Sequence, residues 1–344
     1  MEAIPYSVRT RLGEDVPQRG QFAVMRELPV FAAPEMHNLF PAPKRRPETL
    51  RAAVFNVEHG YRAQEIVSFL SECPDLRNAD ILFGNELDDG TERSGNVDVS
   101  RLLAERLGYN YAYALEFIEL VNPNDQKGCE GNTLFSRWPI VRAQSLYVPE
   151  GYNWYFDEQK RIGGRVAVFC ELDVAGTHIG AVCVHLENRT SPAARAEQVA
   201  AILEKADAMF GDMPILIGGD FNTNAFDYSE ENARAMRAQQ LRDGIVPSPE
   251  PFEPLFALAD RAGFDHRTFN GTGVPTRRRP TGDGVLHLHL DWIFGKSAVC
   301  VGHGTVSTLL CDCGWARADS PLRSAAFAEL SDHNAVYADI KLQP

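Results

Sequence analysis

The chain has no long hydrophobic run and no hydrophobic leader. It begins Met1-Glu2-Ala3-Ile4-Pro5, with an acidic second residue and none of the apolar stretch that a secretory signal needs. No segment approaches the roughly 20 consecutive apolar residues that cross a bilayer as a helix. We therefore expect a cytoplasmic protein without a transmembrane segment.

Basic side chains are scarce. The 344 residues include 34 lysines and arginines against 47 aspartates and glutamates, which gives a formal net charge of -13. Such an excess of negative charge opposes non-specific attraction to the phosphate backbone of nucleic acid. Nucleic acid is therefore a disfavoured partner, and a polyanionic substrate would need a locally basic mouth or bridging cations.

The seven cysteines show no repeated metal-binding spacing. Cys170 and Cys183 lie in apolar, strand-like runs, which is typical of buried, reduced thiols. Cys311 and Cys313, one residue apart in a loop-like segment, could bind metal or act in redox chemistry, but such a pair is a weak signal. We expect the cysteines to be reduced and catalytically silent. Nothing in the pattern indicates an oligomeric state.

Residues 1–48 differ in character from the rest of the chain. They contain several prolines and the basic run Lys44-Arg45-Arg46, and we interpret them as an N-terminal extension without a catalytic role. Residues 49–344 are long enough to form one large domain with an extensive core.

After residue 50, short apolar strands alternate with amphipathic helices. The predicted strands cover residues 52–55, 81–83, 111–114, 166–169, 179–184, 214–217, 288–294 and 335–340, and the predicted helices cover 64–70, 99–107 and 192–210. This mixture favours an α/β fold, a four-layer sandwich of two mixed β-sheets flanked by helices. Residues 224–256 and 296–330 lack strong periodicity and are predicted to be long loops or insertions.

Two acidic elements at opposite ends of this domain carry the chemistry. An apolar strand runs into Asp220 and Asn222, and Asp332 with His333 lies near the C-terminus. Because side chains alternate along a strand, Asp220 and Asn222 share one face and can reach one water or one phosphate. A histidine beside an aspartate can donate to phosphate oxygens. Together the elements suggest metal-assisted hydrolysis of a phosphoester.

More polar residues follow apolar strands, where sheets present reactive groups. They are Asn56, Glu86, His185 and Asp291. Hard cations such as Mg²⁺ take oxygen ligands and need only one or two carboxylates besides the substrate phosphate, which Glu86 and Asp332 could supply. We predict Mg²⁺ as the cofactor, with Mn²⁺ as the alternative. Taken singly, each residue has a structural alternative, such as a turn, a satisfied strand end or a solvated acidic loop.

In this order, the motifs resemble the endonuclease/exonuclease/phosphatase superfamily, whose best-known shape is that of pancreatic deoxyribonuclease. The resemblance runs from about residue 50 to the C-terminus. Its seven pieces are Val54-Phe55-Asn56-Val57, Asn85-Glu86-Leu87-Asp88, residues 132–140 with Ser136-Arg137-Trp138-Pro139, His185-Leu186-Glu187, Ile217-Gly218-Gly219-Asp220-Phe221-Asn222, Leu290-Asp291-Trp292-Ile293 and Ser331-Asp332-His333.

The resemblance implies a role for each motif residue. Glu86 would be the principal metal ligand, assisted by Asn56 and Asp332. Asp220 would align and polarise the attacking water, and Asn222 would position phosphate or water beside it. His333 would donate to a non-bridging phosphate oxygen while Asp291 holds its imidazole.

The family's second catalytic histidine corresponds to His185, with Glu116 as a looser match for its carboxylate partner. Arg137 corresponds to a phosphate-contacting arginine of some nuclease members. Before Asp291, the run that contains Arg278 and Arg279 could clamp a phosphate or be a solvated charge run.

Three functions remain open. The first is a Mg²⁺-dependent phosphodiesterase or phosphatase on a small or lipid-like phosphoester, with Trp154 or Tyr155 against its organic part. The second is a DNA or RNA endo- or exonuclease, which requires Arg93, Arg137 and residues 277–279 to converge into a basic track. The third is an inactive interaction module, although every motif position retains a reactive residue type. The acidic charge favours the first.

Overall fold

Two β-sheets face each other at the centre of the molecule. The structure is a computed structural model that describes residues 4–45, 47–225, 230–282 and 284–342. One sheet has eight strands in the order β1-β4-β5-β3-β2-β15-β14, with β7 paired to β4; the other has five in the order β13-β10-β9-β8-β6. Each sheet contains one parallel pair, β2 with β3 and β9 with β10, among antiparallel neighbours. Both sheets are therefore mixed.

The described residues form the following elements. The strands are β1 Glu35–His37, β2 Leu50–Asn56, β3 Ile81–Asp89, β4 Asn110–Glu119, β5 Cys129–Ser136, β6 Ile140–Tyr147, β7 Arg161–Gly163, β8 Val166–Val174, β9 Thr177–His185, β10 Ile215–Asp220, β11 Arg277–Thr281, β12 Gly284–Leu288, β13 Asp291–Lys296, β14 Ala298–Val306 and β15 Ala335–Leu342. The α-helices are α1 Tyr6–Arg19, α2 Gln21–Arg26, α3 Ala63–Glu72, α4 Val99–Leu107, α5 Pro192–Phe210, α6 Glu230–Asp243, α7 Leu255–Arg261 and α8 Pro321–Ser324.

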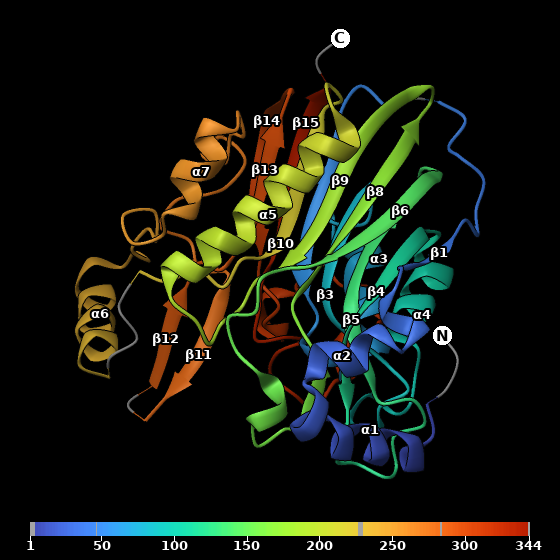
Figure 1. Cartoon of the computed structure of the whole chain (residues 1–344). Coiled ribbons are helices and arrows are strands. Elements are labelled where there is room, and N and C mark those ends of the chain that lie inside the picture. Colours follow the sequence, from blue (N-terminus) through green and yellow to red (C-terminus); the bar gives the residue numbers. More distant parts are fainter. Residues whose placement is uncertain (1–3, 46, 226–229, 283, 343–344) are drawn as a thin grey trace.

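Helices cover the outer face of each sheet. Between the sheets lies a core that includes Phe83, Trp138 and Ile293. A second core joins α3 and α4 to the eight-stranded sheet, and a third joins α5 and α7 to the five-stranded sheet. In Figure 1, α5 passes in front of β10, and it also contacts β8 and β9. The predicted four-layer α/β sandwich is confirmed.

The three predicted helices correspond to α3, α4 and α5. The two segments predicted to be long loops or insertions are not loops throughout, because each contains a regular element. Residues 224–256 contain α6, whose exposed, polar surface leaves only a weak apolar pattern around Met236. Residues 296–330 contain β14, an edge strand of the larger sheet in which glycines at 302 and 304 interrupt the apolar alternation. In both elements, little burial is needed, so hydrophobic periodicity gives little signal.

The segment before β2 packs onto the domain. Val16 and Phe31 join the core of the larger sheet, and β1 pairs with β4. Arg9 is buried completely and donates to the carbonyl oxygens of Glu119, Asn122 and Asp125. The segment thereby braces the loop between β4 and β5. The division of the chain at residue 48 stays a prediction.

None of the helices in the described part of the chain has the length and apolarity required to cross a membrane.

Candidate active site

The ends of three adjacent strands set three polar side chains side by side. His185 ends β9, Asp220 ends β10 and Asp291 begins β13, and the register pairs Asp220 with both of the others. Gly219 allows this close approach: its φ is +148°, and a Cβ there would lie 1.9 Å from the Val184 carbonyl oxygen. Only glycine tolerates this backbone and this contact. The Gly-Gly-Asp sequence therefore places Asp220 in the middle of the row.

A β-bulge places Glu86 at the site. The register between β3 and β5 shifts between Gly84 and Leu87, and Glu86 adopts a left-handed φ of 56°. Bulges redirect side chains and often lie beside active sites. The half-buried Glu86 side chain consequently lines a cavity of about 240 Å³ together with Asp332.

Asn56, at the end of β2, joins the two central carboxylates. Its Nδ2 donates to Glu86 Oε1 at 3.0 Å and to Asp220 Oδ2 at 3.2 Å, while its Oδ1 accepts from the Glu58 N–H at 3.1 Å. Because the amide oxygen already accepts from the backbone, the amide nitrogen faces the carboxylates. Asn56 therefore orients Glu86 and Asp220 and presents a donor, rather than an oxygen, to the site.

Two histidines point their Nε2 atoms at Asp220. The distances from Asp220 Oδ2 are 3.8 Å for His185 and 3.7 Å for His333. His185 Nδ1 lies 3.1 Å from Glu116 Oε2, and His333 Nδ1 lies 2.8 Å from Asp291 Oδ2. Each carboxylate fixes its imidazole so that the other ring nitrogen faces the centre. A bulge between Leu115 and Phe117 lies at Glu116.

Burial shifts the protonation of these groups. It raises the pKa of Asp291 to about 8 and lowers that of His333. It also raises the pKa of Asp220, against the opposing effect of His333 and His185. Burial raises the pKa of Asp332 to about 6, although His333 and Arg277 favour its ionised form. Positive charge near these carboxylates would favour their ionised, reactive forms.

The donors fit a hard divalent cation in one place and not in another. Glu86 and Asp332 line one solvent-accessible cavity and offer carboxylate oxygens, the ligands that Mg²⁺ prefers. His59, Asp88 and Glu130 also converge, but Arg93 bonds to both carboxylates at 2.7 Å, and Arg161 bonds to Glu130 at 3.1 Å. In the cluster of His59, Asp88 and Glu130, guanidinium groups therefore already provide the positive charge that a metal ion would supply.

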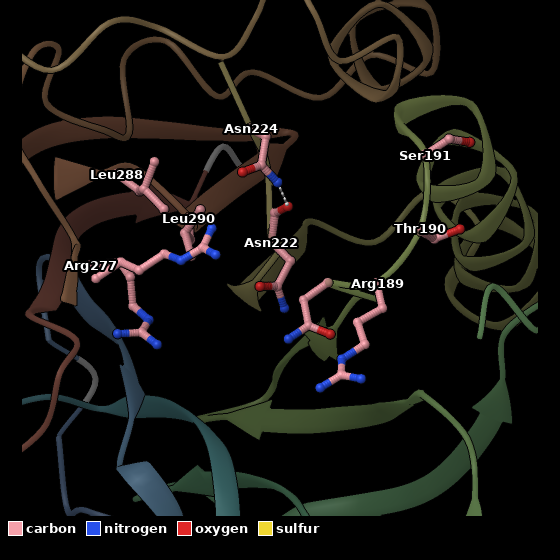
Figure 2. A pocket seen from close by; sticks show the side chains of 10 residues that line it. Arg189, Thr190, Ser191, Asn222, Asn224, Arg277, Leu288 and Leu290 are labelled. Carbon is pink, nitrogen blue, oxygen red and sulfur yellow. Dashed lines mark hydrogen bonds between the residues drawn. The ribbon is translucent and has the colours of Figure 1, made fainter. Parts of the chain in front are cut away.

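A larger groove of about 680 Å³ opens beside these residues and includes Asn222 in its lining. It lies between the β11–β12 hairpin and the loop before α5, and Asn222 lies on its floor. Figure 2 shows Asn222 and Asn224 between Arg277 on one side and Arg189 on the other. Asn188 and Arg277 line both this groove and the smaller cavity, so the two spaces are neighbours.

Two predicted substrate contacts lie elsewhere. Arg137 donates to the carbonyl oxygens of Ala79 and Arg77, at the end of the sheet opposite Glu86. Arg278 donates hydrogen bonds to Glu329, Thr308 and the Ser331 carbonyl oxygen, so it holds the C-terminal loop in place. The third, Arg279, lines the groove.

The two aromatic residues proposed as substrate contacts, Trp154 and Tyr155, are largely buried by other parts of the protein. Trp154 donates from Nε1 to Glu187 at 2.9 Å and packs under the guanidinium groups of Arg161 and Arg189. Tyr155 is buried and donates to the Gly13 carbonyl. Trp154 also lines the smaller cavity, whereas Tyr155 attaches the loop to α1.

Two residues beside the site were not predicted from the sequence. Arg165 donates to Glu116 and lies 3.0 Å from His185 Nδ1, and His59 lies 3.6 Å from Glu86. Neither residue belongs to a motif. Their partners come from other parts of the chain, so no local pattern could have identified them.

The fold and the gathered carboxylates and histidines define a class: metal-dependent hydrolases of phosphoester bonds. The chain belongs to the Endonuclease/Exonuclease/phosphatase family, whose model matches residues 53–333. No curated protein sequence gives a significant match.

Solved structures share the fold at low sequence identity. An endonuclease/exonuclease/phosphatase from Beutenbergia cavernae has 18% identity and a TM-score of 0.58, over 86% of this chain and 72% of its own. The human Nocturnin catalytic domain with bound sulfate has 16% identity and a TM-score of 0.54, over 91% and 97%. TDP2 from Caenorhabditis elegans has 14% identity and a TM-score of 0.51, over 85% and 74%. These likenesses concern the fold.

Proposed function

We propose that this chain hydrolyses a small phosphodiester or phosphomonoester with the help of Mg²⁺, by in-line attack of water. The observation that carries the proposal is the position of Asp220. It is buried, faces the Nε2 atoms of His185 and His333, and is joined through Asn56 to Glu86. A carboxylate held in this way is suited to align and deprotonate water.

Glu86 and Asp332 would hold the cation, with Mn²⁺ as the alternative to Mg²⁺. When bound, a divalent cation neutralises charge on the phosphoryl oxygens. Asn56 would keep Glu86 and Asp220 in place through its amide nitrogen. Arg277, 2.5 Å from Asp332, would balance charge at the edge of the site.

The remaining catalytic residues would act on the phosphate. His333 would donate from Nε2 to a non-bridging oxygen, with Asp291 fixing the ring at 2.8 Å. His185, fixed by Glu116, would do the same from the other side of Asp220. Asn222, whose backbone N–H donates to Asp220 Oδ1, would present its side chain to the phosphate from the groove floor.

The arginine positions favour a small ester over nucleic acid. A nuclease track would need Arg93, Arg137 and residues 277–279 to converge. Arg93 is bonded to Asp88 and Glu130, and Arg137 lies at the far end of the sheet. Only Arg277 and Arg279 of that set line the groove. A duplex binder neutralises several phosphates, and this arrangement offers few cations for that task.

A hydrolysis panel tests the proposal. Bis(p-nitrophenyl) phosphate, p-nitrophenyl phosphate, inositol phosphates and plasmid DNA are each incubated with Mg²⁺, with Mn²⁺ or with EDTA. We expect cleavage of a small ester that EDTA abolishes and Mg²⁺ restores. Efficient DNA cleavage at physiological salt, with negligible action on small esters, would contradict the proposal.

A further inference from the structure

The groove beside the catalytic residues is basic in an acidic protein. Arg189, Arg277 and Arg279 line it, and no carboxylate is among its described lining residues. The chain as a whole carries a formal charge of -13. The three arginines are therefore a local excess of positive charge, although Arg277 pairs with Asp332 and Arg189 with Asp157. Low-dielectric walls strengthen the attraction of such a groove for anions.

Strand geometry directs two of these arginines into the groove. Arg277 and Arg279 alternate with Arg278 along β11, so they share one face while Arg278 turns to Glu329 on the other. Arg277 pairs with Asp332 beside the catalytic residues. Arg279 is exposed and forms no ion pair with any described residue. Its Cα lies about 7 Å farther along the strand than that of Arg277.

The opposite wall and the floor supply different chemistry. Arg189 reaches the groove from the loop after β9, with its guanidinium against Tyr152 and bonded to Asp157. Leu288 and Leu290 form an apolar wall from the hairpin side. A ligand in this groove would thus meet apolar surface along its body and cations at its end.

We propose that the groove binds a second phosphate carried on the organic part of the same small substrate. This inference rests on the proposed function, because the scissile phosphate must lie over Asp220 and Asn222. The organic part then lies against Leu288 and Leu290. Arg279 meets the second phosphate, with Arg189 across the groove, and a guanidinium group suits the bidentate geometry of a phosphate.

A matched pair of chromogenic esters tests this directly. Thymidine 5′-(p-nitrophenyl phosphate) and its 3′-phosphorylated analogue share the leaving group and differ only in the second phosphate. With Mg²⁺, we expect kcat/KM to be roughly tenfold higher for the 3′-phosphorylated ester, mainly through KM. Arg279→Ala should reduce this preference to less than about threefold. Arg101→Ala, which removes a surface pair with Glu105 on α4, should leave the preference unchanged.

Equal kcat/KM for the two esters, or an unchanged preference in Arg279→Ala, would overturn the inference. A thymidine hexanucleotide cleaved more efficiently than either ester, with a steep salt dependence, would also overturn it in favour of a nucleic-acid groove.

If neither ester is cleaved with Mg²⁺ or Mn²⁺, the proposed function is wrong. Calorimetry then still tests whether the groove binds a second phosphate. Thymidine 3′,5′-bisphosphate should then bind the full-length protein roughly tenfold more tightly than thymidine 5′-monophosphate, and Arg279→Ala should remove the difference. Equal affinities in the wild-type protein would refute the second phosphate site.

Discussion

Two clusters of carboxylates around a histidine lie near each other in this molecule, and they differ in how their charge is balanced. In the first, which we call the closed cluster, Asp88 and Glu130 near His59 bond to Arg93 and Arg161. In the second, the open cluster, Asp220 and Asp291 surround His333. Among the described residues, no arginine lies within ion-pair distance of either of these aspartates.

The same residue types therefore serve different purposes. Guanidinium groups make the closed cluster a structural network, because buried carboxylates with bonded cations are satisfied. In the open cluster, burial raises the pKa values of Asp220 and Asp291 without a bonded guanidinium to offset it, and the cluster adjoins Glu86. Burial also raises the pKa of Asp88, and His59 and Glu130 line the same cavity as Glu86, so the bonded arginines are what separate the two clusters. Substitutions should accordingly affect turnover in the open cluster and stability in the closed one.

The largest loss of activity is expected from Glu86→Gln. The substitution removes a negative oxygen ligand while nearly preserving shape, so Mg²⁺-supported turnover should fall by about a thousandfold or more. Thermal unfolding should change little. Glu105→Gln on the surface of α4 is the matched control. Wild-type turnover with an unchanged Mg²⁺ dependence would show that Glu86 is not the ligand.

Asp220→Asn and His333→Ala should each lower kcat by about a hundredfold or more. Because both side chains act on one transition state, the double variant should lose less than the product of the single losses. Steady-state kinetics of the two single variants and the double variant measure this. Fully multiplicative losses would place the two residues in separate sites.

In the closed cluster, Arg93→Met should act on folding. It leaves Asp88 and Glu130 buried without their shared guanidinium, which should lower the free energy of unfolding by about 3–5 kcal/mol. Urea denaturation measures the loss, with Arg101→Met as the control. Activity per folded molecule should fall less than in Asp220→Asn. An unchanged midpoint would mean that Arg93 does not stabilise the cluster.

The smallest effect is expected from thiol alkylation. Cys311 is exposed, whereas burial covers Cys170 and Cys183 and raises their pKa values. Iodoacetamide under native conditions should modify Cys311 and leave most activity. Mass spectrometry measures the modification of Cys311, and the ester assay measures the remaining activity of the same sample. Activity lost in step with Cys311 modification would contradict a silent role for the cysteines.

The open cluster could be anticipated from the sequence because its two aspartates lie at the ends of short apolar strands and His333 lies in a short acidic motif. Asp220 ends and Asp291 begins such a strand, and the sheet register brings them together beside His185 at the end of β9. His333 lies in the Ser-Asp-His element before β15. The closed cluster could not be anticipated, since Arg93, Arg161 and His59 come from three separate segments without a shared motif. Its partners emerge only from tertiary packing.

The groove separates two arginines that the sequence does not distinguish. The sequence allows Arg278 and Arg279 alike to clamp a phosphate or to form a solvated charge run, yet they point to opposite faces of β11. The period-two rule separates them once the segment is known to be a strand. The sequence around β11 contains three arginines and a proline and has no apolar alternation, so the strand itself was not predicted.

Calorimetric titration with Mg²⁺ tests the contrast between the two clusters most directly. Wild-type protein, Glu86→Gln and Asp88→Asn are titrated under identical conditions. The cavity lined by Glu86 and Asp332 should bind Mg²⁺ in the wild type and in folded Asp88→Asn. The binding should disappear in Glu86→Gln. Binding that survives in Glu86→Gln and disappears in Asp88→Asn would place the cation in the closed cluster and contradict the account.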